Sequence, residues 1–130
     1  MENKKTLDQI RVAVALDAKG KIGGGADGGV KIKGFPTMIQ NNGLLGALAY
    51  SVEYDHKNNK YKNNAEYNMS KFAVEYLNKL KLNSYSVTGD HDIENPESLI
   101  KFLTQCSPEQ FRRINAEVLA FLNYFRRFAS

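Results

Sequence analysis

The chain has 130 residues, of which 42% are hydrophobic and 25% are charged, and its net charge is +4. This length predicts one folded domain over residues 1–130. No apolar run approaches the roughly 20 residues that cross a bilayer, and the first ten residues lack the apolar part of a secretory signal. The single cysteine, Cys106, cannot form an internal disulfide. We therefore expect a reduced, cytoplasmic protein without a membrane partner.

The first predicted elements are a helix and a glycine-rich loop. Thr6 and Gln9 form the pattern of a capping box, which predicts a helix over about 7–18. The run from Val12 to Leu16 also fits a short strand, and so short a run leaves both options open. Residues 20–34 hold seven of the ten glycines, a density that predicts a flexible loop and no helix.

Four further helices are predicted after this loop. Pro36 suits the first turn of a helix that extends to about Tyr54, with a kink at Asn42-Gly43. A polar loop over 55–64 follows, then a helix over 65–82 with apolar residues at helical spacing. After a loop over 83–94, Asn95-Pro96 and Ser107-Pro108 predict the starts of helices over 96–105 and 108–128.

These segments predict an all-α fold, a compact bundle of about five helices with essentially no sheet. The apolar faces of the segments supply the side chains that should share one core. We expect these to be Phe35, Ile39, Leu48, Phe72, Leu77, Ile114, Val118, Phe121 and Leu122.

No motif in the chain indicates catalysis, a cofactor or a metal. The glycines from Gly23 to Gly28 match G-x-G-x-x-G, but a dinucleotide site also needs a preceding strand and a βαβ unit. His56 and His91 have aspartates beside them, and histidines in polar loops are more often solvated than metal-bound. We therefore expect a protein that is not an enzyme, although a small ligand-binding domain built on the glycine loop stays open.

The charges are unevenly distributed, which bears on possible partners. Arg112 and Arg126 lie about 40° apart around the last predicted helix, as do Arg113 and Arg127, with about 21 Å of rise within each pair. Such a set could contact phosphates several nucleotides apart. Six lysines between 57 and 81 form a second basic group, from which we select Lys71 and Lys79 as candidate RNA contacts. Residues 90–97 hold four acids and no base.

Glu117 lies near the edge of the apolar face of the last predicted helix, where an unpaired carboxylate would be costly. Two structural roles are open for it. It could be a rim residue bonded to a neighbouring helix terminus, or a buried acceptor that orders the bundle.

Two segments resemble a known family. The block from Lys33 to Leu44, followed by Leu48-Ala49-Tyr50, is similar to a block of the small subunit of Cmr-type (type III-B) CRISPR complexes. The stretch from Ile114 to Ala129 resembles the terminal helix of that subunit, with Asn115 where the family usually has Thr. Pro36, Gly43, Asn115 and Glu117 belong to these blocks and are expected to have structural roles.

The resemblance implies a helical, non-catalytic subunit of an RNA-guided complex in antiviral defence. Such subunits stack head to tail as a short filament and help form the groove that receives target RNA beside the guide RNA. The implied partners are the other subunits of the complex, further copies of the chain, and RNA that the isolated protein binds weakly. The rival interpretation is a helical protein–protein adaptor unrelated to RNA.

Overall fold

The computed structural model describes residues 5–22, 28–52, 54–55, 57, 60–61 and 65–128. These residues form five helices and one very short hairpin. The helices are α1 (Leu7–Ala18), α2 (Gly28–Ser51), α3 (Ala65–Leu82), α4 (Pro96–Gln105) and α5 (Pro108–Phe128). The predicted all-α fold is thus confirmed, and four of the helices have the predicted bounds. The run from Val12 to Leu16, which also suited a strand, is part of α1.

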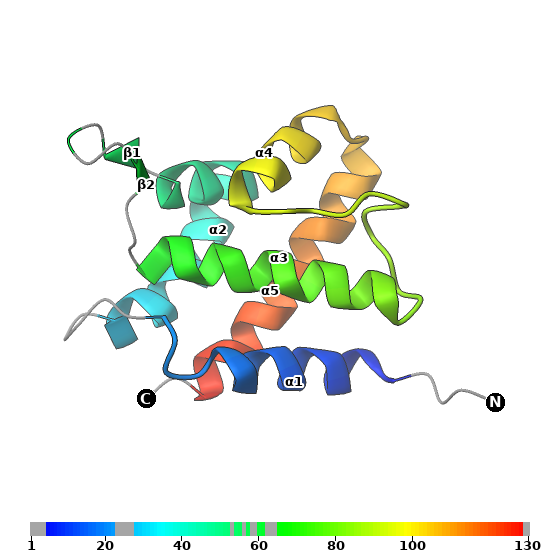
Figure 1. Cartoon of the computed structure of the whole chain (residues 1–130), viewed down its shortest axis with the longest axis horizontal. Helices are drawn as coiled ribbons and strands as arrows, with labels where there is room; N and C mark the ends of the chain where they lie inside the picture. Colours follow the sequence, from blue (N-terminus) through cyan, green and yellow to red (C-terminus); the bar gives the residue numbers. More distant parts are fainter. Residues whose placement is uncertain are drawn as a thin grey trace.

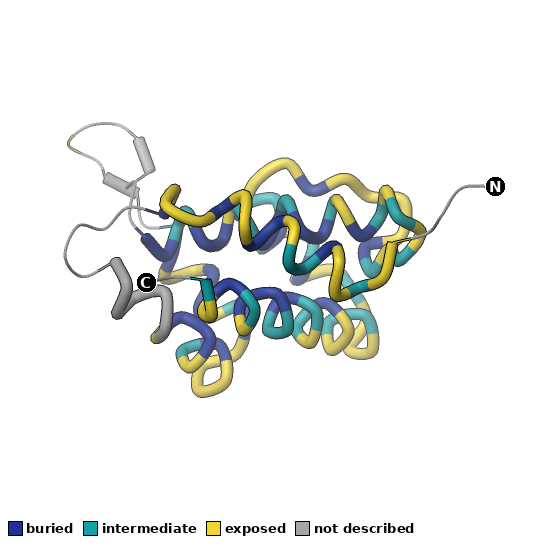
Figure 2. Tube along the Cα trace, turned by 90° about the horizontal axis from the view of Figure 1, so that it is seen from below, coloured by how far each residue is buried: buried dark blue, intermediate teal, exposed yellow. Residues whose placement is uncertain are grey.

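The helices pack in layers around α3. Figure 1 shows α3 running across the front of the molecule, with α1 below it, α4 above it and α5 crossing behind it. Packing contacts join α3 to α1, α2, α4 and α5, so it is the central element of the bundle. Buried stretches of the helices face one another, and exposed stretches face outward (Figure 2). The outer faces of α3 and α5 therefore lie on opposite sides of the molecule.

Local capping explains where two of the helices, α1 and α4, begin. The Thr6 hydroxyl accepts a hydrogen bond from the Gln9 amide at 3.1 Å, and the Gln9 side chain accepts one from Thr6 N at 2.8 Å. The Asn95 side chain caps α4 through Ser98 N at 2.8 Å, ahead of Pro96. These contacts satisfy amides that the first helical turn leaves unpaired, so these short sequence signals define helix starts.

α2 differs from its prediction at both ends. It begins at Gly28 rather than at Pro36, so Pro36 lies inside the helix and not in its first turn. The loop predicted over 20–34 is therefore wrong from Gly28 onward, while residues 23–27 lie outside the described part. Each glycine costs a helix only about 1 kcal/mol, and the core packing of the adjoining turns can outweigh that. Downstream, α2 ends at Ser51 and does not reach Tyr54.

The kink expected at Asn42-Gly43 is present as a break at Gly43. Gly43 has φ 81° and ψ 162°, which lies outside the helical region and is accessible almost only to glycine. α2 therefore consists of two helical pieces joined at this residue.

The segment predicted as a plain polar loop over 55–64 contributes a two-stranded hairpin. Its strands β1 (Tyr54–Asp55) and β2 (Lys60–Tyr61) are antiparallel, with Tyr54 opposite Tyr61. The described residues contain this one sheet. Because its strands have only two residues each, the fold is still classified as all-α.

One hydrophobic cluster receives side chains from all five helices. The predicted core residues are buried except for Phe72, which is half-buried at the cluster's edge. At its centre the Tyr76 and Phe121 rings stack at 5.0 Å between centroids, and Phe121 meets Phe125 edge-on at 6.1 Å. The Tyr76–Phe121 stack joins α3 to α5 and helps to fix which face each helix turns outward.

Candidate interaction surfaces

The four arginines predicted to contact RNA are all exposed on α5. Arg112 and Arg113 lie near its start, and Arg126 and Arg127 lie in its last turn. Arg113 forms an ion pair with Glu109 at 3.3 Å, and both side chains are largely in solvent. The Arg127 guanidinium lies over the Tyr124 ring at 5.3 Å, close enough for a cation–π contact. The outer face of α5 therefore presents a basic strip made of two arginine pairs, one near each end of the helix, with no basic residue between Arg113 and Arg126.

The two candidate lysines lie elsewhere. Lys71 and Lys79 are exposed on α3, whose outer face lies opposite that of α5 (Figures 1 and 2). Glu75 lies one turn from each of them on the same face. The structure thus brings the four arginines together on one surface and keeps these lysines apart from them, among acidic neighbours.

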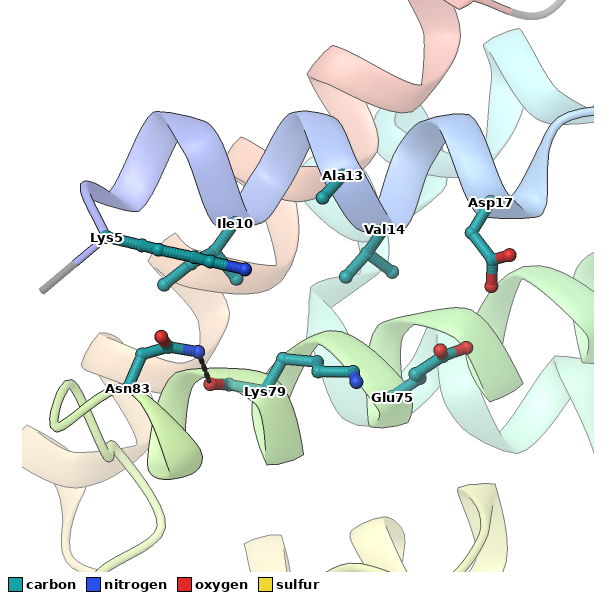
Figure 3. Close-up of a pocket in the computed structure, with 8 residues that line it drawn as sticks. All are labelled: Lys5, Ile10, Ala13, Val14, Asp17, Glu75, Lys79 and Asn83. Carbon is teal, nitrogen blue, oxygen red and sulfur yellow. Dashed lines mark hydrogen bonds between the residues drawn. The ribbon is translucent and has the colours of Figure 1, made fainter. Parts of the chain in front are cut away.

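A groove separates α3 from α1. It has a volume of about 300 Å³, and Figure 3 shows the eight residues that line it. Ile10, Ala13 and Val14 contribute an apolar floor from α1. Lys5 lies at one end and Asp17 at the other, so the charge changes sign along the groove.

A second groove of about 300 Å³ lies on the other side of α3, toward α4. Tyr67, Lys71, Val74 and Leu82 come from α3, while Glu94 and Asn95 come from the segment before α4. Glu75 and Lys79 line both grooves, so they form the ridge between them. With 78% of its surface exposed, Leu82 is the most exposed of the large hydrophobic residues at the described positions.

Three polar side chains join α1, α3 and α5 beneath these surfaces. Arg11 Nη2 donates to Glu117 Oε1 at 2.8 Å, Tyr76 Oη donates to the same oxygen at 2.7 Å, and Arg11 Nε donates to Tyr76 Oη at 3.0 Å. Glu117 is thus a half-buried acceptor whose partners are side chains of two other helices, and not a helix terminus. The sequence pattern indicates a structural role for Glu117 but gives no such signal for Arg11 or Tyr76.

The network changes the acidity of its members. Burial raises the pKa of the Tyr76 phenol, and its hydrogen bond to Glu117 raises that pKa further. Burial lowers the pKa of the Arg11 guanidinium, but hydrogen bonds to Glu117 and Tyr76 outweigh burial and raise it overall. At neutral pH Arg11 is therefore charged and Tyr76 is protonated. Arg11 and Glu117 form an ion pair, and the neutral Tyr76 hydroxyl donates a further hydrogen bond to Glu117.

The network continues toward solvent through Asp8. Arg11 Nη1 contacts Asp8 Oδ1 at 3.3 Å, and the Tyr124 hydroxyl donates to that oxygen at 2.9 Å. The hydrogen bond to Asp8 raises the pKa of Tyr124. Two carboxylates therefore connect α1 to α5, namely the half-buried Glu117 of α5 and the exposed Asp8 of α1.

The other residues expected to be structural have distinct surroundings. Pro36 is buried inside α2, where it lacks the amide that would bond to the carbonyl four residues earlier. Within the described part of the chain, Asn115 Oδ1 on α5 is buried and has no hydrogen-bond partner. The structure supplies no reason for the polar side chain of Asn115.

The residues considered for metal binding do not come together in the described part of the chain, where no group of three or more His, Cys, Asp or Glu could hold an ion. The His91 ring packs on Phe102 at 5.0 Å, and Cys106 Sγ donates to the Leu103 carbonyl at 3.4 Å. His56 lies outside the described residues. None of the described helices is long and apolar enough to span a membrane.

Comparison with known proteins adds a family assignment. No curated protein and no solved structure is similar enough to the chain to count as a match. One family model, described as CRISPR-associated protein (Cas_Cmr5), matches residues 29–130. The match covers α3, α4, α5 and nearly all of α2, while α1 lies outside it. Because it spans most of the chain, this protein belongs to the Cas_Cmr5 family of CRISPR-associated proteins.

Proposed function

We propose that this chain is a non-catalytic, cytoplasmic small subunit of a type III-B CRISPR RNA-guided complex. In this role copies stack head to tail as a short filament and help to form the groove that receives target RNA. Its partners are the other subunits of the complex, neighbouring copies, guide RNA and target RNA. Membership of the Cas_Cmr5 family supports assignment to a CRISPR-associated subunit.

The observation that carries the RNA contact is the basic outer face of α5. Its four arginines are exposed, and none of them contributes to the half-buried Arg11–Tyr76–Glu117 network. Guanidinium groups donate planar pairs of hydrogen bonds that suit phosphate oxygens. The rise between Arg112 and Arg126 is about 21 Å, so the strip can follow several nucleotides of a strand.

The basic strip of one subunit binds RNA weakly, and the strips of several stacked subunits together bind it more tightly. A net charge of +4 allows only a handful of phosphate contacts per subunit. Stacked copies would hold successive strips in register, and linked weak contacts add up to strong capture. RNA capture therefore depends on assembly.

The test is capture of target RNA by the reconstituted complex. One variant subunit replaces Arg112, Arg113, Arg126 and Arg127 with Ala. A matched control replaces four exposed lysines outside that strip with Ala, namely Lys5, Lys19, Lys21 and Lys101. Both variants lose four positive charges, so net charge alone cannot separate them.

We expect the arginine variant to assemble normally and to lose at least about tenfold in target affinity, while the lysine control stays close to the parent. Equal capture by the arginine variant and the parent would make the subunit an architectural spacer or an adaptor without RNA contact. A third variant, with Lys71 and Lys79 replaced by Ala, tests whether the α3 lysines contribute.

A further inference from the structure

The outer face of α3 has a charge pattern that is complementary to itself. Glu75 and Lys79 lie one turn apart on the ridge between the two grooves. Within the described part of the chain, neither residue takes part in an ion pair, although this order of acid and base on a helix favours one. Both charges are therefore available to a partner that seats on the ridge.

One exposed large apolar side chain accompanies these charges, which favours a protein partner over a nucleic acid. Leu82 is 78% exposed at the end of the ridge. Of the apolar residues that line the neighbouring grooves, Ala13 is exposed, whereas Ile10, Val14 and Val74 are buried. A protein that seats on the ridge would remove the apolar surface of Leu82 from water, which favours association.

We propose that the occupant of this face is a second copy of the chain, related to the first by a two-fold axis. When two α3 helices pack antiparallel about a point between Glu75 and Lys79, each Glu75 faces the second copy's Lys79. The two unpaired charges of each copy thus form two equivalent cross-pairs, as an isologous interface requires. Leu82 of each copy then reaches the part of the other copy's groove that Lys71 and Val74 line.

This contact goes beyond the proposed function and does not depend on it. Head-to-tail stacking joins two different surfaces and stays open, whereas the two-fold contact joins one surface to itself and closes as a pair. The outer face of α5 lies on the other side of the molecule and is not covered by the pair (Figures 1 and 2). Because one helix and its flanking grooves form a small interface, we expect the pair to be weak and dependent on concentration.

The test uses the isolated full chain and sedimentation equilibrium over a range of concentrations. The variants Glu75→Lys and Lys79→Glu each place like charges opposite each other in their own pair, so each should weaken self-association at least about tenfold. In an equimolar mixture, the Glu75→Lys copy faces the Lys79→Glu copy with both charge pairs restored. We therefore expect the mixture to associate within about threefold of the parent.

A double variant carrying both substitutions is a second check, since it reverses both charges and stays complementary to itself. Circular dichroism confirms that every variant is folded. If the parent does not associate at up to about 1 mM, the inference is overturned. It is also overturned if the single variants associate like the parent, or if folded single variants fail to associate when mixed.

Discussion

The outer faces of α3 and α5 belong to helices that pack against each other, yet they differ in almost every property that selects a partner. The face of α5 carries four exposed arginines with Glu109 as a close acidic neighbour of one of them. The face of α3 alternates Lys71, Glu75 and Lys79, is flanked by two grooves and ends in an exposed Leu82. We propose phosphate as the partner of the α5 face and protein as the partner of the α3 face.

This difference shows that the net charge of the chain says little about where an anion would bind. A lysine and an arginine each add one positive charge to the net charge of +4. On the outer face of α3, however, Glu75 lies between Lys71 and Lys79. Arginine also differs from lysine in its geometry, because its planar fork can hold a phosphate with two hydrogen bonds. The two faces therefore differ in where their basic side chains lie and in whether these are lysines or arginines.

The largest expected effect on stability comes from removing the aromatic stack between α3 and α5, because this stack orients both helices. Phe121→Ala deletes the ring that stacks on Tyr76 and meets Phe125 in the core. We expect it to lower the free energy of unfolding by about 3–5 kcal/mol, measured by urea denaturation. Asn123→Ala, at an exposed position two residues away, is the control and should change stability by less than about 0.5 kcal/mol. Equal effects would mean that the aromatic stack does not stabilise the packing of α3 on α5.

A smaller effect is expected from the polar network that ties α1 to both helices. Glu117→Gln keeps the shape of the side chain but removes the charge that pairs with Arg11 at 2.8 Å. We expect a loss of about 1–3 kcal/mol in the free energy of unfolding, because the half-buried Arg11 keeps only the exposed Asp8 as a charged partner. Asp8→Asn removes an exposed carboxylate from the same guanidinium and should cost less than about 1 kcal/mol. The reverse order of effects would contradict the structural role of Glu117.

The network also predicts how stability depends on pH. The pKa of Tyr76 is raised in the folded state, by burial first and then by its bond to Glu117. The unfolded chain therefore loses this proton first, so the stability contributed by Tyr76 is complete below about pH 10 and is lost as the pH rises further. Between about pH 10 and pH 11 the parent should lose about 1 kcal/mol more than Tyr76→Phe, measured by urea denaturation at each pH. Parallel losses in the two proteins would contradict the raised pKa.

The sequence predicts the fold well where the signals are local. The Thr6–Gln9 capping box and the Asn95-Pro96 pair define helix starts by contacts within four residues, and the structure contains both. The periodic apolar faces of α3 and α5 are equally local, which is why their bounds and most of their core residues were predictable. The break at Gly43 follows from one residue's conformational freedom.

The incorrect and missing predictions have non-local causes. Gly28 and Gly34 weaken a helix by propensity, yet α2 includes both because core packing around Phe35 and Ile39 outweighs that cost. The partners of Glu117 are 106 and 41 positions away, so no spacing rule could find them. The grooves beside α3 likewise depend on which helices become its neighbours.

The distinction between the two faces can be tested most directly by the salt dependence of RNA binding. The isolated parent, the four-arginine variant and the Lys71/Lys79 variant would each be titrated with one single-stranded RNA at several salt concentrations. Each phosphate contact contributes about −0.7 to the slope of log K against log salt, so four arginine contacts give about −3. We expect the parent and the lysine variant to share that slope and the arginine variant to have a slope near zero. A slope that survives loss of the arginines but falls on loss of the two lysines would contradict the assignment of RNA to α5.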